Sequence, residues 1–261
     1  DLVKKTKELL YKVGINPQRF SSFPHEFSGG MRQRVAIALA IALNPQLIIA
    51  DEPTTSLDTI IADQIMSELY SLCDELRIAL LLITHDLSIA YKWCNKIAIL
   101  DCGQIIESGN IKDIIWYPKT EIAKRLVNSG RMLEGSKREL LQKRAKLLEV
   151  NRLRCWHETG LWPFRAAWIK AVNEVTFSIY QGETLGIVGP SGCGKSTLCR
   201  ALVGLMPIRG GSIIFLGKNI STINRKYLKE LRKYIQIIFQ DPYACLNPKM
   251  SVIDAIIDPI L

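Results

Sequence analysis

The stretch Gly-Pro-Ser-Gly-Cys-Gly-Lys-Ser-Thr, residues 189–197, is the strongest indication of the fold in this sequence. It fits the pattern Gly-x-x-x-x-Gly-Lys-Ser/Thr of a phosphate-binding loop. Residues 183–188 before it predict a buried strand, and residues 195–206 after it predict a helix. A strand, a glycine-rich turn and a helix N-terminus direct backbone N–H groups and the positive helix end at one point. We therefore expect this loop to bind a nucleoside triphosphate.

Each residue type in the loop suits a different part of such a ligand. Glycines let the backbone wrap a phosphate without side chains in the way. Lys195 can reach the β- and γ-phosphates, and the Ser196 hydroxyl can bind Mg²⁺. A glycine-rich turn without a ligand is the less favoured alternative, because every fixed position of the pattern is filled. The predicted nucleotide-binding residues of the loop are Gly189, Pro190, Ser191, Gly192, Cys193, Gly194, Lys195, Ser196 and Thr197.

Length and composition indicate an ordinary globular protein. The 261 residues suffice for one large or two small domains, and 48% of them are hydrophobic. No apolar run is long enough to span a bilayer, and the first residues do not resemble a signal peptide. Because the sequence does not begin with Met, we expect it to be part of a longer polypeptide. The seven cysteines form no Cys-x-x-Cys pair, which favours reduced thiols over disulfides or zinc.

The net charge of +9 is concentrated in one stretch. Residues 119–154 hold eleven Lys or Arg and four Glu. A basic helix there could contact anionic lipid, but a solvated linker is the favoured interpretation. We expect no nucleic-acid partner.

A second group of motifs precedes the loop in the chain. Ser28, Gly29 and Gly30 open a segment that is apolar on nearly all sides, and Ser28 is a good helix N-cap. The apolar strand predicted at residues 47–50 ends at Asp51 and Glu52, and the one predicted at 78–83 ends near His85. Carboxylates at the end of a buried parallel strand, next to a phosphate loop, can bind Mg²⁺ and attacking water.

These motifs resemble those of the ABC ATPases in order and spacing. Residues 27–34, 47–52 and 56–58, together with His85, are similar to the signature motif, the Walker B strand, the D-loop and the switch histidine. The resemblance implies an α/β P-loop NTPase fold with a RecA-like core, an antiparallel β subdomain and a helical subdomain. The form Phe-Ser-Gly-Gly-Met-Arg-Gln-Arg, with Met31 where many members carry Gln, resembles the dipeptide/oligopeptide importers.

The resemblance also implies roles for individual residues. Glu52 would polarise the attacking water, Asp51 would hold Mg²⁺ through water, and His85 would contact the γ-phosphate. The segment Ser28-Gly29-Gly30 would contact the γ-phosphate of a nucleotide held by the opposite subunit. A helix N-terminus is an anion site, and a carboxylate beside a metal suits water activation, so the chemistry agrees with these roles.

Two further positions complete the predicted site. Residues 240–248 resemble the Q-loop of peptide importers, which implies that Gln240 binds Mg²⁺ and the attacking water and couples the nucleotide to a transmembrane partner. An aromatic residue near the start of the family's domain usually stacks on adenine. Trp156 has that place if residues 160–168 are an insertion, and Trp168 is the alternative. Both could also be core residues.

The order of the motifs predicts an unusual organisation. Residues 1–127 resemble the C-terminal part of one ABC ATPase domain, residues 152–261 resemble the N-terminal part of a second, and 128–151 form a linker with a charged helix at 137–150. We expect the middle of a fused tandem ATPase. Joined as one circularly permuted domain, the halves would place strand 184–188 beside strand 47–50 and Ser196 near Asp51. Otherwise they are two half-domains with unpaired sheet edges.

The expected function is ATP binding and hydrolysis that energises import of peptides or a related solute. The expected cofactors are ATP and Mg²⁺. The resemblance implies transmembrane permease subunits, an ABC ATPase dimerisation partner and, indirectly, a solute-binding protein, with the chain peripheral on the cytoplasmic face of the membrane. The alternatives are a soluble ABC ATPase acting on ribosomes or DNA, and a piece that binds nucleotide without turnover. Because no cysteine lies between Cys102 and Cys155, we expect no iron–sulfur cluster.

Overall fold

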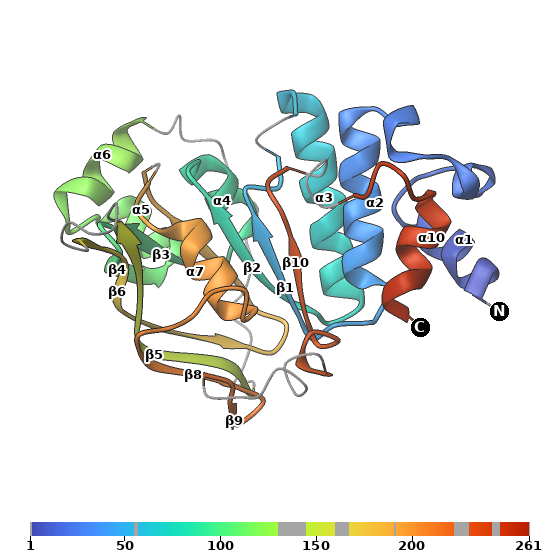
Figure 1. Cartoon of the computed structure of the whole chain (residues 1–261). Coiled ribbons are helices and arrows are strands. Elements are labelled where there is room, and N and C mark those ends of the chain that lie inside the picture. Colours follow the sequence, from blue (N-terminus) through green and yellow to red (C-terminus); the bar gives the residue numbers. More distant parts are fainter. Residues whose placement is uncertain are drawn as a thin grey trace. The chain divides into compact units, whose positions relative to one another are not determined.

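The computed structural model of the chain describes residues 2–54, 57–129, 145–159, 167–190, 192–221, 230–241 and 246–260 (Figure 1). The chain divides into two compact units. Unit 1 consists of Asp1–Ile78 with Arg232–Leu261, and unit 2 consists of Ala79–Leu231. Each unit therefore combines segments from the two predicted ATPase halves.

Unit 1 is mainly helical. Its α-helices are α1 (Leu2–Lys12), α2 (Gly29–Ile41), α3 (Thr59–Glu75) and α10 (Val252–Ile257), and its short 3-10 helices are η1 (Pro17–Ser21), η2 (Pro24–Glu26) and η3 (Asp258–Ile260). Helix α2 contacts α1, α3 and α10, as Figure 1 also shows. This central place explains why α2 is apolar on nearly all sides: it is covered by neighbours around most of its circumference.

Two parallel strands complete unit 1. Strand β1 (Leu47–Asp51) is buried at every residue and pairs in parallel with β10 (Ile235–Ile238), with Ala50 opposite Ile238. Because parallel strands end at the same edge, the residues that follow β1 and β10 emerge together. One strand comes from each half of the sequence.

Unit 2 contains a sheet in the order β2 (Ala79–Thr84), β7 (Thr184–Val188), β3 (Lys96–Asp101) and β4 (Gln104–Asn110). Strand β7 is parallel to β2 and to β3, and β3 and β4 form an antiparallel hairpin. The α-helices described in unit 2 are α4 (Leu87–Trp93), α5 (Ile111–Trp116), α6 (Glu121–Ser129) and α7 (Lys195–Leu202).

The prediction that strand 184–188 lies beside strand 47–50 is wrong. Strand β7 is hydrogen-bonded to β2 on one edge and to β3 on the other, and a strand has only two edges. The alternative of two half-domains with unpaired edges is also wrong for these strands, since β7 lies between two first-half strands and β10 pairs with β1. The domain boundaries at 127 and 152 stay a prediction.

A second, antiparallel sheet of unit 2 has the order β6 (Ala167–Tyr180), β5 (Lys146–Thr159), β8 (Gly210–Phe215) and β9 (Lys218–Asn219). The predicted charged helix 137–150 is therefore wrong over 146–150, which belong to β5. Leu148 and Val150 are fully buried there, between β6 and β8, so pairing on both edges outweighs the local helix preference. Residues 137–144 lie outside the described residues.

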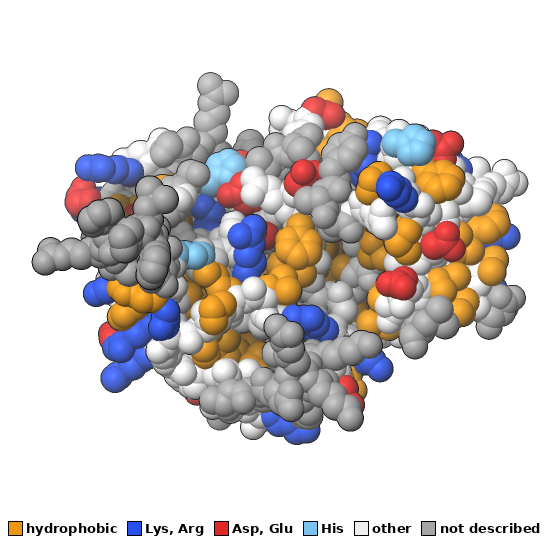
Figure 2. All heavy atoms as spheres, in the orientation of Figure 1, with side chains coloured by type: hydrophobic (Ala, Val, Ile, Leu, Met, Phe, Trp, Pro, Cys, Tyr) orange, Lys and Arg blue, Asp and Glu red, His pale blue; other side chains and the backbone are white. Residues whose placement is uncertain are grey.

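No helix among the described segments combines the length and apolar character that a membrane span requires. On the face drawn in Figure 2, Lys and Arg side chains form several separate groups with hydrophobic and other side chains between them.

Candidate functional site

The loop 189–197 has the strand–loop–helix context that the sequence predicts. Strand β7 ends at Val188, and α7 begins at Lys195 after Gly194, whose φ of 106° lies in the left-handed region. Ser191 lies outside the described residues. The loop therefore leads directly into the positive N-terminal end of α7, an arrangement that favours an anion.

The glycines of the loop differ in their surroundings. A Cβ atom at Gly189 would overlap the carbonyl oxygen of Leu100, and one at Gly194 would overlap that of Ala171. A Cβ atom at Gly192 would have nothing within 4 Å. The loop backbone is thus packed closely on one side and open at Gly192, as a phosphate cradle requires.

This contrast predicts different effects for two matched substitutions. Gly194→Ala and Gly192→Ala both place a side chain at positive φ, which costs roughly 1–2 kcal/mol. Only Gly194→Ala adds the overlap with Ala171, so we expect it to lower the free energy of unfolding by at least about 1 kcal/mol more. Urea unfolding of both variants measures the difference. Equal losses would contradict the packing described for Gly194.

Lys195 is 5% exposed, and its ammonium group is held inside the loop. Its Nζ donates hydrogen bonds to the carbonyl oxygens of Gly189 at 2.9 Å and Pro190 at 3.0 Å. Burial raises the pKa of the neighbouring Cys193 thiol, although the Lys195 charge acts in the opposite direction. The loop therefore holds the Lys195 side chain against its own backbone carbonyls.

His85 lies at the same edge of the sheet as the loop. Thr84, the last residue of β2, is opposite Val188 in the parallel pair, so His85 and Gly189 each follow the end of adjacent strands. The His85 side chain is exposed. Asp86 then caps α4 by accepting a hydrogen bond from the Ser88 backbone N–H at 2.7 Å.

Strand β5 also reaches the loop. Nε2 of His157 lies 3.4 Å from Oγ1 of Thr197. Sequence reasoning missed His157, which belongs to no motif; its place directly after Trp156 was the one available signal.

The two candidate tryptophans have different environments. Trp156 is half-buried, and its indole N–H is buried without a hydrogen-bond partner among the residues that the structure describes. Lys170 Nζ lies 5.3 Å from the centre of its ring. Trp168 is 41% exposed, with the Arg209 guanidinium 4.1 Å from its ring centre. Trp156 is therefore the more enclosed of the two rings.

Unit 1 brings together two predicted catalytic residues. Nε2 of Gln240 donates a hydrogen bond to Oε2 of Glu52 at 3.3 Å, at the common edge of β1 and β10. Asp51 beside them is 5% exposed. Glu52 has a φ of 47°, in the left-handed region that non-glycine residues rarely adopt. Backbone strain of this kind is concentrated at functional sites.

The segment 28–30 starts α2 as predicted. Ser28 is the N-cap, and its hydroxyl accepts a hydrogen bond from the Met31 backbone N–H at 3.4 Å. A Cβ atom at Gly30 would lie 2.8 Å from Cγ2 of Ile61, so a larger residue there would collide with α3. Ser28 itself is exposed, which leaves the helix N-terminus accessible to an anion.

The structure thus groups the predicted site residues into two sets. The loop, His85 and Trp156 belong to unit 2, whereas Ser28–Gly30, Asp51, Glu52 and Gln240 belong to unit 1. The expected closeness of Ser196 and Asp51 stays a prediction, because these residues belong to different units. Hydroxyl, carboxylate and amide oxygens are the hard ligands that Mg²⁺ prefers, so Ser196, Asp51 and Gln240 fit that ion chemically.

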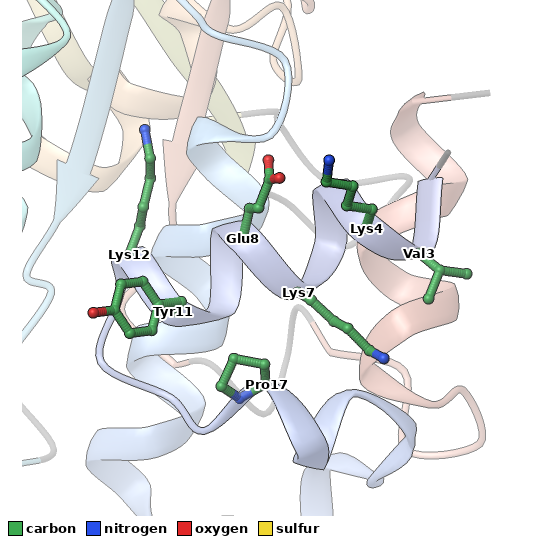
Figure 3. Close-up of a pocket in the computed structure, with 7 residues that line it drawn as sticks. All are labelled: Val3, Lys4, Lys7, Glu8, Tyr11, Lys12 and Pro17. Atoms are coloured by element: carbon green, nitrogen blue, oxygen red, sulfur yellow. The ribbon is translucent and has the colours of Figure 1, made fainter.

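A groove of about 760 Å³ lies on helix α1, apart from the predicted site residues. Figure 3 shows Lys4, Glu8 and Lys12 projecting to one side of the helix and Tyr11 to another. The full lining is Val3, Lys4, Lys7, Glu8, Tyr11, Lys12 and Pro17. None of these residues belongs to a predicted catalytic or nucleotide-binding motif.

Comparisons with known proteins agree with the motifs. The family described as ABC transporter matches residues 2–55 and 172–257. The chain is 36% identical over 253 residues to the peptidoglycan transport ATP-binding protein YejF of Agrobacterium fabrum, covering 95% of this chain and 46% of that protein. It is 35% identical over 284 residues to the glutathione import ATP-binding protein GsiA of Escherichia coli K12. That match covers 98% of this chain and 46% of that protein. The chain therefore spans about half the length of the curated relatives it matches.

Proposed function

This chain belongs to the ABC transporter family, and we propose that it binds ATP at loop 189–197 and hydrolyses it to energise import of a solute. The observation that carries the proposal is the position and hydrogen bonding of the Lys195 side chain inside the loop. Its buried ammonium group is held by two loop carbonyls, at 2.9 and 3.0 Å, within a glycine backbone that leaves room at Gly192. Phosphate oxygens are stronger acceptors than carbonyls for such a cation.

In the proposed complex, the loop residues surround the phosphates. Backbone N–H groups at the start of α7 donate to phosphate oxygens, Lys195 binds the β- and γ-phosphates, and Ser196 contributes its hydroxyl to Mg²⁺. Trp156 stacks on the adenine. Its half-buried ring and unpaired indole N–H, among the described residues, support this choice over Trp168.

For hydrolysis, Glu52 orients and polarises the attacking water, and Gln240 helps to hold that water. Their hydrogen bond supports a shared task, because it places an amide and a carboxylate at one strand edge. Asp51, through water, and Gln240 would hold Mg²⁺, and His85 would contact the γ-phosphate. When bound, Mg²⁺ neutralises charge on the phosphates.

The proposal also gives a role to the N-terminus of α2. Ser28, Gly29 and Gly30 contact the γ-phosphate of a nucleotide held by an ABC ATPase partner. The exposed position of Ser28, at the positive end of a helix of 13 residues, supports this role.

The chain is proposed to work as part of a longer tandem ATPase. It covers 46% of the relatives named for peptidoglycan transport and glutathione import, and its two halves carry complementary sets of motifs. Strand β7 pairs with β2 and β3, and β10 pairs with β1, so each unit combines strands from both halves, which supports a chain that carries parts of two ATPase domains. The proposed partners are permease subunits and, indirectly, a solute-binding protein. The proposed location is peripheral, on the cytoplasmic face of the membrane. Peptides or a related solute are the proposed cargo.

A pull-down separates this function from that of a soluble ABC ATPase acting on ribosomes or DNA. An affinity-tagged copy of the parent protein, isolated from detergent-solubilised cells, is expected to retain integral membrane subunits after nuclease treatment. A Gln240→Ala variant is expected to retain less of them, because Gln240 is the proposed link to the permease. Recovery of ribosomal proteins or DNA, without membrane subunits, would overturn the transport proposal.

A further inference from the structure

His157 is an exposed residue of β5 that makes a contact with the nucleotide loop. Its Nε2 lies 3.4 Å from the hydroxyl oxygen of Thr197, which is the third residue of α7. The two residues are separated by 40 positions in the sequence, so the contact depends on the packing of β5 beside the loop. An exposed neutral hydrogen bond contributes little to folding.

The chemistry of this pair depends on which group donates. If the Thr197 hydroxyl donates to Nε2, its only proton is used and it cannot donate to a phosphate oxygen. If an Nε2–H group donates to Oγ1, the hydroxyl proton is directed elsewhere. An anion at the N-terminus of α7 favours the second arrangement, because it offers the hydroxyl a strong acceptor.

We infer that His157 is a positioning residue for the bound nucleotide. Its Nε2–H group donates to Oγ1 of Thr197 and thereby orients the Thr197 hydroxyl to donate to a phosphate oxygen. The inference rests on the proposed function, since it assumes phosphates in loop 189–197. Strand β5 would then contribute two residues to the nucleotide site, Trp156 and His157.

A series of substitutions at His157 tests the donor requirement. Glutamine keeps an amide donor, alanine removes the group, and glutamate can only accept and adds negative charge. We expect ADP affinity within about threefold of wild type for His157→Gln, about 3- to 10-fold weaker for His157→Ala, and weaker still for His157→Glu. Isothermal titration calorimetry with ADP and, in parallel, adenosine measures the effects; adenosine affinity should not change, because adenosine has no phosphate.

Matched controls distinguish positioning from folding. His25 is exposed, belongs to unit 1 and stacks on Phe23, so the same three substitutions at His25 should leave ADP affinity unchanged. Thermal unfolding of every variant shows whether the fold is intact. The inference is overturned if His157→Ala binds ADP as tightly as wild type, if glutamine fails to rescue, or if adenosine binding falls equally. If wild type binds ADP and these tests fail, only the role of His157 is lost; if wild type binds neither ADP nor ATP, the proposed function fails with it.

Discussion

Replacing Lys195 by alanine is expected to weaken ATP binding by about 100-fold or more. The Lys195 ammonium group is buried in the loop, where it donates to the Gly189 and Pro190 carbonyls, and phosphate oxygens are stronger acceptors that can replace these carbonyls. A hydrogen bond to a charged group contributes about 1.5–3 kcal/mol, and two such bonds correspond to a factor of about 100 or more in affinity.

Isothermal titration calorimetry with ATP and Mg²⁺ measures this loss. The control is Lys112→Ala, which removes an exposed lysine of α5 from the same unit and should leave affinity unchanged. Thermal unfolding should show an intact Lys195→Ala fold, because the two carbonyls released at the loop can be hydrated. Affinity within threefold of wild type would contradict the proposed nucleotide site.

Glu52→Gln is expected to lower the rate of ATP hydrolysis by about 10² to 10⁴ while ATP affinity stays within a few-fold of wild type. A positioned general base contributes that range to the rate, and an amide cannot accept the proton of water. Glutamine has the size of glutamate and its amide oxygen can still accept the hydrogen bond from Gln240, so the local geometry is kept.

Phosphate release and ATP titration on the same samples separate turnover from binding. Glu75→Gln, at an exposed position of α3 in the same unit, is the matched control and should hydrolyse ATP at the wild-type rate. Unchanged hydrolysis in Glu52→Gln would remove Glu52 from the proposed mechanism. If wild type binds ATP but releases no phosphate, the chain is a nucleotide-binding piece without turnover.

Local elements could be predicted from the sequence because their causes are local. The phosphate loop, its flanking strand and helix, and the hairpin of β3 and β4 follow from glycine positions and apolar periodicity within a few residues. The Ser28 cap is likewise a contact across three residues. The family match agrees with what these motifs indicated.

Pairings between distant segments could not be predicted in the same way. Strands β1, β2 and β7 are buried at every residue, and a strand that is buried on both faces does not show in its sequence which neighbour it will join. The expected pairing of 184–188 with 47–50 therefore gave way to pairing with β2 and β3, and the charged segment before residue 151 became part of β5.

The sequence by itself determined which residues are candidates for nucleotide chemistry, since motifs depend on residue type and short spacing. Only the tertiary structure decided which of them meet. Glu52 and Gln240 are 188 residues apart in the chain and hydrogen-bonded in space, and His157 of strand β5 reaches Thr197 of helix α7. The physical reason is that local hydrogen-bonding periods form helices and strands, whereas burial of complementary surfaces selects which strands lie together.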